Sequence, residues 1–160
     1  MSKHERIEEF VGGLGVERGG GLHPCYAGYF LCFNRGDYYE AHDVLEHLWL
    51  STTGDDYVFY KGLIQLAGAF VHLKKHFGAP RHPTHSRRLY PAERLFLIAA
   101  DNLAGFAPRR HDLLIEPVLE LCRGHSRQIR GDGFTRNPWN PRRLPQLAPE
   151  GHQLAENAGK

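Results

Sequence analysis

Residues 33–49 read FNRGDYYEAHDVLEHLW and contain the clearest helix start in the chain. Asp37 and Glu40 have the spacing of a capping box, in which two side chains accept hydrogen bonds from the first backbone amides of a helix. Apolar side chains then recur at intervals of three and four residues, namely Tyr38, Ala41, Leu45, Leu48 and Trp49. This periodicity is typical of an amphipathic helix, and it predicts one over residues 38–51.

The same periodicity extends over most of the chain. It covers five further segments, which are residues 4–11, 24–33, 57–77, 89–106 and 115–130. Pro91 falls inside the fourth of these segments, so we expect the helix to restart or kink there. No stretch alternates β-branched and polar residues as a half-buried strand would. The pattern predicts an all-α fold, a compact single-domain bundle of about 4–6 helices.

Glycine and proline set the expected domain organisation. Residues 12–21 include six glycines, too many for a stable element. We therefore expect residues 1–22 to form a flexible N-terminal segment with room for one short helix, followed by a helical bundle domain over residues 23–130. Residues 131–160 are rich in proline, glycine and arginine, and they predict an extended or partly disordered C-terminal arm. Trp139 is expected to pin this arm to the bundle.

Composition narrows the classes of function. The 160 residues are 41% hydrophobic and 24% charged, with a formal net charge of +2, which suits one globular domain and not a dedicated nucleic-acid binder. Residues 37–56 nevertheless carry six acidic side chains and no lysine or arginine, whereas residues 123–143 carry six arginines and one acid. These surfaces either complement each other, within the chain or between copies in a homo-oligomer, or the basic surface binds an anionic ligand such as RNA.

Three features bear on cellular location. No run of about 18 apolar residues is present, so no membrane span is predicted. The first residues are charged without an apolar run behind them, so no secretory leader is expected. Cys25, Cys32 and Cys122 form an odd set without C-x-x-C spacing, as expected for small core residues of a cytoplasmic protein.

Four polar side chains on two predicted helices form the candidate site. His42 and Glu46 are four residues apart, so they share one face of their helix. Gln65 and His72 lie within the apolar pattern of residues 57–77, where an unpaired amide or imidazole costs about 1–3 kcal/mol. Because a short connection favours antiparallel neighbouring helices, we expect these four groups to meet in one polar pocket.

Other side chains complete the predicted ligand-binding pocket. Tyr38 and Trp49 are expected to form its roof, with Lys61 on the same stripe as Gln65. Glu40 is placed at the pocket mouth, although its capping role is a sufficient alternative. Small residues of the second helix are expected to permit close approach of the two helices; they are Gly62, Ala67, Gly68 and Ala69.

Two hypotheses assign work to this pocket. In acid–base chemistry His42 is the base, Glu46 orients it, Gln65 holds a small-molecule substrate, and His72 donates a proton. The candidate ligands of a divalent metal, the one cofactor considered, are His42, Glu46 and His72. Their spacing is neither HExxH nor Glu-x-x-His, and His47 projects to another side of its helix. The competing hypothesis is an interaction or scaffold module in which these groups only form hydrogen bonds between helices.

Together, the two stretches resemble the family called domain of unknown function 309. The elements of its pattern occur in order as Phe33-Asn34, Gly36, Tyr38-Tyr39, Glu40-Ala41-His42, Leu45-Glu46, Trp49, Gly62-Leu63-Ile64-Gln65, Ala67 and His72. The resemblance covers residues 26–76 and implies a compact helical bundle, without implying a reaction. It marks as signature positions Asn34, Glu40, His42, Glu46, Trp49, Gln65 and His72. Beyond residue 76 the chain departs from the family pattern, and the arm has no counterpart.

Overall fold

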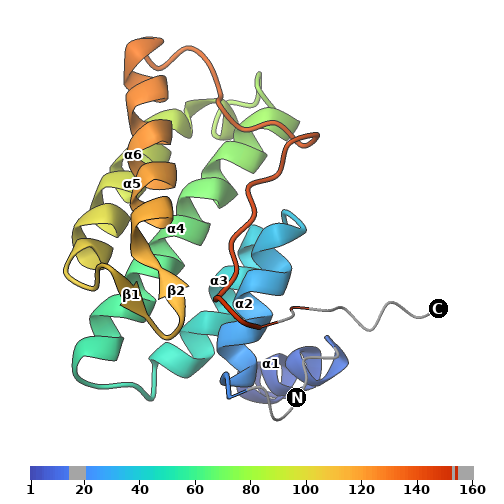
Figure 1. Ribbon diagram of the computed structural model, residues 1–160. Coiled ribbons are helices and arrows are strands. Elements are labelled where there is room, and N and C mark those ends of the chain that lie inside the picture. The colour runs from blue at the N-terminus through green and yellow to red at the C-terminus, as the bar shows by residue number, and fades with distance from the viewer. Residues whose placement is uncertain (15–20, 153, 155–160) are drawn as a thin grey trace.

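The computed structural model describes residues 1–14, 21–152 and 154 (Figure 1). Its α-helices are α1 (Lys3–Gly13), α2 (Pro24–Asn34), α3 (Tyr38–Trp49), α4 (Asp55–Gly78), α5 (Leu89–Ala104) and α6 (Ile115–Gly131). A single turn of 3-10 helix, η1 (His85–Arg87), precedes α5. Strands β1 (Arg109–Arg110) and β2 (Leu113–Leu114) form an antiparallel ladder that the sequence did not predict. The predicted all-α fold is confirmed.

The predicted capping box at the start of α3 is wrong. Asp37 does occupy the N-cap position, and its carbonyl accepts from the Ala41 amide, but its side chain makes no capping hydrogen bond. A capping box forms instead at α1, where the Ser2 hydroxyl accepts from the Glu5 amide and the Glu5 carboxylate accepts from the Ser2 amide. This box stabilises a helix that begins at the third residue of the chain.

Pro91 does not break α5. It lies in the first turn of the helix, where a missing amide hydrogen costs no intrahelical bond, so the predicted restart or kink is wrong. Pro24 occupies the equivalent place at the start of α2, as the sequence predicted. The two prolines therefore mark helix starts.

The core is built around α2, whose residues 25–33 are all buried. A helix that is apolar on every side belongs inside a domain. α3 packs against α2 and α4, α4 against α5, and α5 against α6. The Tyr29 hydroxyl donates to the Leu63 carbonyl at 2.6 Å, which joins α2 to α4 in the buried interior.

Gly62 and Gly68 lie on one stripe of α4, and this glycine stripe faces α5. A Cβ atom on Gly62 would lie 2.7 Å from Leu103 Cγ, which is too short for any real contact, and one on Gly68 would lie 3.4 Å from Leu95 Cδ1. Glycine at position 62 therefore lets α4 and α5 approach closely. We expected this stripe to face α3, and the structure overturns that expectation.

The arm that follows α6 is extended and lies along α4 toward α2 and α3, drawn in orange to red in Figure 1. Trp139 is only 6% exposed, and its Nε1 donates to the Tyr38 hydroxyl at 2.9 Å, so the prediction that it pins the arm is confirmed. Asn34 holds a second point of the arm, because its Nδ2 donates to the Leu147 carbonyl at 2.8 Å and its Oδ1 accepts from the Leu147 amide at 2.7 Å.

At the N-terminus the helix extends further than the glycine content suggested. Gly12 and Gly13 belong to the last turn of α1, and residues 15–20 of the glycine-rich stretch lie outside the described residues. In the arm, residues 153 and 155–160 are likewise outside them.

Two expectations about the side chains are settled by the fold. All three cysteines are buried free thiols, as predicted, and burial raises the pKa of Cys32 and Cys122 to about 12. The acidic stretch does not pair with the arginines of residues 123–143 anywhere in the described part of the chain. Its ion pairs with lysine or arginine instead join Glu46 to Lys3 and Asp56 to Arg110.

Over the described ranges no helix has the length and apolar character needed to span a membrane.

Candidate functional site

His42 and Glu46 form the predicted pair on one face of α3. His42 Nε2 lies 3.8 Å from Glu46 Oε2, and His42 Nδ1 lies 3.1 Å from Asp43 Oδ1. The other Glu46 oxygen accepts from Lys3 Nζ at 3.2 Å, so this side of α3 is turned toward α1 and not into the core. The core side of α3 carries the buried residues, which are Tyr38, Ala41, Val44 and Leu45.

Gln65 and His72 do not meet this pair. Gln65 Oε1 accepts from Asn102 Nδ2 of α5 at 2.7 Å, and His72 Nδ1 lies 3.1 Å from Arg88 Nη1, beside the start of α5. Among the described residues no hydrogen bond or ion pair joins them to His42 or Glu46. The structure therefore joins Gln65 and His72 to the α5 side of α4 and not to His42 and Glu46, because the stripe that carries them also carries the glycines that face α5.

The two aromatic side chains that were expected to form the roof of the pocket have other neighbours. Tyr38 is 1% exposed and stacks on Phe70 inside the core. Trp49 stacks on Tyr57 with ring centroids 4.8 Å apart, and its Nε1 donates to the Tyr57 carbonyl at the turn between α3 and α4. The two charged members, Glu40 and Lys61, are exposed.

We expect His72 to make the fold sensitive to acid. Burial, followed by the charges of Arg88 and Lys75, lowers the pKa of His72 from 6.5 to about 4. The unfolded chain binds this proton near pH 6.5, whereas the folded protein binds it only near pH 4. Stability from this group is therefore full above pH 6.5 and is lost as the pH falls toward 4. After a discount for partial exposure, the loss is on the order of 1–2 kcal/mol.

Urea denaturation at about pH 7 and about pH 4.5 measures this loss. His72→Gln should lose less unfolding free energy between the two pH values than the unmodified protein. His82→Gln, which removes an exposed imidazole, serves as the control and should behave like the unmodified protein. An equal loss in the protein and in His72→Gln would show that His72 does not resist protonation in the fold.

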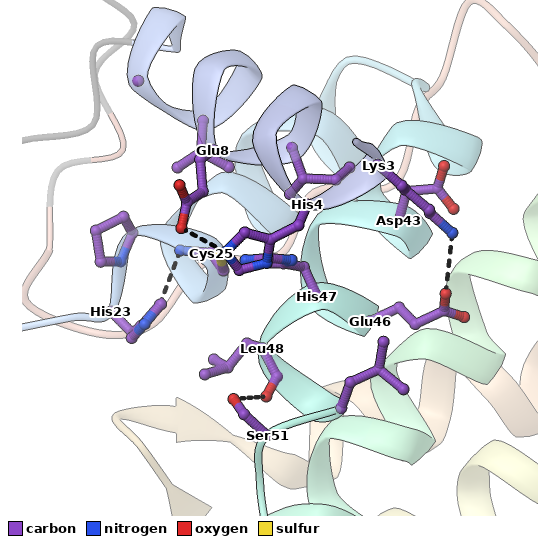
Figure 2. Close-up of a pocket in the computed structure, with 15 residues that line it drawn as sticks. Lys3, His4, Glu8, His23, Cys25, Asp43, Glu46, His47, Leu48 and Ser51 are labelled. Atoms are coloured by element: carbon purple, nitrogen blue, oxygen red, sulfur yellow. Dashed lines mark hydrogen bonds and ion pairs between the residues drawn. The ribbon is translucent and has the colours of Figure 1, made fainter. Parts of the chain in front are cut away.

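The side of α3 that carries Glu46 borders a cleft that we call the α1–α3 cleft (Figure 2). Its volume is about 750 Å³, and it lies between α1, the start of α2 and α3. The apolar part of its wall includes Ile7, Val11, Pro24, Leu48 and Leu50. The lysine, histidine and acidic side chains of the wall are Lys3, His4, Glu8, His23, Asp43, Glu46 and His47. Of the predicted site residues, Glu46 alone is among those that line the cleft.

Three titratable side chains gather at one place on the cleft wall, as Figure 2 shows. His4 Nε2 lies 3.0 Å from Glu8 Oε1, and the rings of His4 and His47 have centroids 4.2 Å apart. One ligand atom from each of the three residues can be chosen so that all lie within 4.8 Å of one another. His47 was not expected to be a metal ligand, because it does not share a face of its helix with His42. In the structure its partner, His4, comes from another helix.

Charges in the cleft favour a positive group. The hydrogen bond to Glu46 and the nearby charge of Asp43 raise the pKa of Lys3. Burial, and to a lesser extent His47, lowers the pKa of His23, whose Nδ1 accepts from the Cys25 amide at 3.1 Å. At neutral pH the cleft therefore holds three carboxylates, one ammonium group and an imidazole that resists protonation.

Comparison with known proteins bears on part of the chain. A family model described as Domain of unknown function (DUF309) matches residues 26–77, which confirms the predicted resemblance. We find no curated protein and no solved structure that matches the chain. The matched residues contain most of α2, all of α3 and nearly all of α4. They supply the α3 side of the α1–α3 cleft, whereas α1 and residues 23–25 supply the rest.

Proposed function

We propose that this protein, whose residues 26–77 match DUF309, binds a small cationic ligand in the α1–α3 cleft. One observation carries the proposal: the cleft already stabilises a positive group, the Lys3 ammonium, through Glu46 and Asp43. A ligand with an ammonium or similar group finds the same carboxylates there. Where the ligand's apolar part shields it from solvent, a charge-assisted hydrogen bond to these carboxylates contributes about 1.5–3 kcal/mol.

Lys3 does not block such a ligand. Its side chain is 59% exposed, and an exposed ion pair contributes little free energy, so the ammonium can leave Glu46 for solvent at small cost. The apolar wall near Ile7 and Leu48 offers a surface for the hydrocarbon part of the ligand. A pocket with an apolar wall and a few convergent polar groups is the usual form of a small-molecule site.

For Gln65 and His72, the other half of the predicted site, a structural role is the better explanation. Gln65 and His72 each have a polar partner on or beside α5. We therefore propose that they contribute hydrogen bonds between helices, as in the competing sequence hypothesis, and that the acid–base roles of Gln65 and His72 fall away. Satisfied buried polar groups hold neighbouring helices in one register.

Benzylamine and benzoate test the cleft, because they share a ring and carry opposite charges. In ¹H–¹⁵N correlation spectra, benzylamine should shift amide signals of α1 and the facing side of α3, and benzoate should not. Loss of the carboxylates in the double variant Asp43→Asn, Glu46→Gln should weaken benzylamine binding about tenfold or more, since each tenfold change corresponds to about 1.4 kcal/mol.

Glu116→Gln is the matched control, because it removes an exposed carboxylate of α6 far along the chain from the cleft. This variant should bind benzylamine as the unmodified protein does. Equal binding of benzoate, or benzylamine shifts confined to other helices, contradicts the proposal.

A further inference from the structure

We infer that His4, Glu8 and His47 bind one divalent transition-metal ion of the zinc class at the wall of the α1–α3 cleft. The inference goes beyond the proposed function, because it assigns a metal ion to other residues of the same cleft and can hold without the organic ligand. It differs from the metal site expected from the sequence, whose candidate ligands His42, Glu46 and His72 are divided between two parts of the fold.

Two of the ligands come from one helix. His4 and Glu8 are four residues apart on α1, so their side chains lie one turn from each other on the same face. Their nearest ligand atoms, Nε2 and Oε1, are 3.0 Å apart. The capping box at Ser2 and Glu5 holds the first turn of this helix and thereby places His4.

The third ligand comes from α3 and closes the set. The rings of His47 and His4 lie 4.2 Å apart between centroids, with an angle of 48° between their planes. In a tetrahedral zinc site the bond lengths of about 2.0–2.2 Å place ligand atoms about 3.4 Å from one another. The three atoms here lie within 4.8 Å, so side-chain rotations alone can bring them to that geometry.

The donor set selects the class of metal. Two imidazole nitrogens and one carboxylate oxygen suit zinc and its neighbours among the first-row transition metals. Calcium and magnesium prefer sets made entirely of oxygen atoms. Three protein ligands leave a fourth coordination position for water or for an anionic group of a ligand.

Binding at this place would join α1 to the bundle more firmly. α1 contacts the bundle through the Lys3–Glu46 ion pair and through a small apolar cluster that includes Ile7, Val11 and Val44. A metal shared by α1 and α3 adds a further connection between them. Binding to the folded state alone stabilises that state, so the unfolding temperature should rise as the metal concentration is raised above Kd.

Isothermal titration of the full, untagged chain with zinc chloride, after removal of bound metal with a chelator, tests the inference. We expect one zinc ion per chain. His4→Ala, Glu8→Ala and His47→Ala should each weaken zinc binding about tenfold or more, since each substitution removes one of the three ligands. Magnesium chloride at the same concentration should give no comparable heat.

A second histidine pair supplies the matched control. The rings of His82 and His85 lie 4.4 Å apart, much as those of His4 and His47 do, but within the described part of the chain neither forms a hydrogen bond or ion pair with a carboxylate. His82→Ala should therefore leave zinc binding unchanged. Circular dichroism and thermal unfolding without metal establish that each variant is folded before it is titrated.

The outcomes separate the two proposals. Absence of zinc binding, or zinc binding that survives all three ligand substitutions, overturns the metal site. If benzylamine still binds the cleft in that case, the proposed function stands without it. If zinc binds at these residues and benzylamine does not bind, the metal site stands and the proposal of an organic cation is lost.

Discussion

Replacement of Trp139 with alanine is expected to lower the free energy of unfolding by about 3–5 kcal/mol, the usual cost of truncating a buried tryptophan. The indole packs edge-on against Tyr38 and Phe77, with ring centroids 6.2 and 5.3 Å away. Its Nε1 also donates to the Tyr38 hydroxyl, which is buried and would lose this partner. Both effects act in the same direction, so the arm should leave the bundle in a large fraction of molecules.

Urea denaturation followed by circular dichroism measures the loss, and hydrogen exchange of the Leu147 amide reports whether the arm remains in place. Trp139→Phe is the matched control. It keeps an aromatic ring but cannot donate to Tyr38, so its cost should be about 1–2 kcal/mol. An alanine variant that loses less than about 1 kcal/mol, with Leu147 still protected, would show that the tryptophan does not hold the arm.

The second large effect is expected at Phe70. This side chain is fully buried in α4 and contacts aromatic rings on both sides, from Phe33 and Tyr38 to Phe96 and His125. Phe70→Ala leaves a cavity between α2, α3, α5 and α6. We expect a loss of about 3–5 kcal/mol in the free energy of unfolding.

Thermal and urea denaturation of Phe70→Ala should be compared with Leu97→Ala, which truncates an apolar side chain of α5 that is 37% exposed. The control should change stability by about 0.5 kcal/mol or less. If the two variants are equally stable, the ring contacts of Phe70 contribute no more than a surface side chain does.

The helices themselves were predictable because helical periodicity is local. The pattern predicted a helix over residues 57–77, and α4 runs over Asp55–Gly78. The start of α2 at Pro24 was also read correctly, since proline there fits the first turn of a helix. Such features depend on neighbours a few residues away, and the sequence contains that information in full.

Which face of α4 meets which neighbour could not be predicted. α4 is apolar on more than one side, so periodicity alone does not choose between α3 and α5 as the partner of the glycine stripe. The choice depends on Leu103, which fits against Gly62 from a helix more than thirty residues further along the chain. Gln65 and His72 go with that stripe, so their hydrogen-bond partners lie on or beside α5 and not on α3.

The site that the structure favours depends on contacts just as distant. His4 and His47 are separated by 43 positions, and no local pattern joins them. The spacing of His4 and Glu8 and the Ser2–Glu5 capping box were present as signals for a well-defined first helix. Without the packing of α1 on α3, however, neither indicated a third partner.

The Asn34 side chain presents a carbonyl and an amide hydrogen to the arm in the way that a peptide group does, and so imitates one rung of a β-ladder. A rung of this kind recognises main-chain atoms and is indifferent to the side chain opposite. Because the Leu147 side chain is only 8% exposed and packs into the core, other apolar residues can replace it, with one exception. Proline in place of Leu147 is excluded, because the rung needs the amide hydrogen that proline lacks.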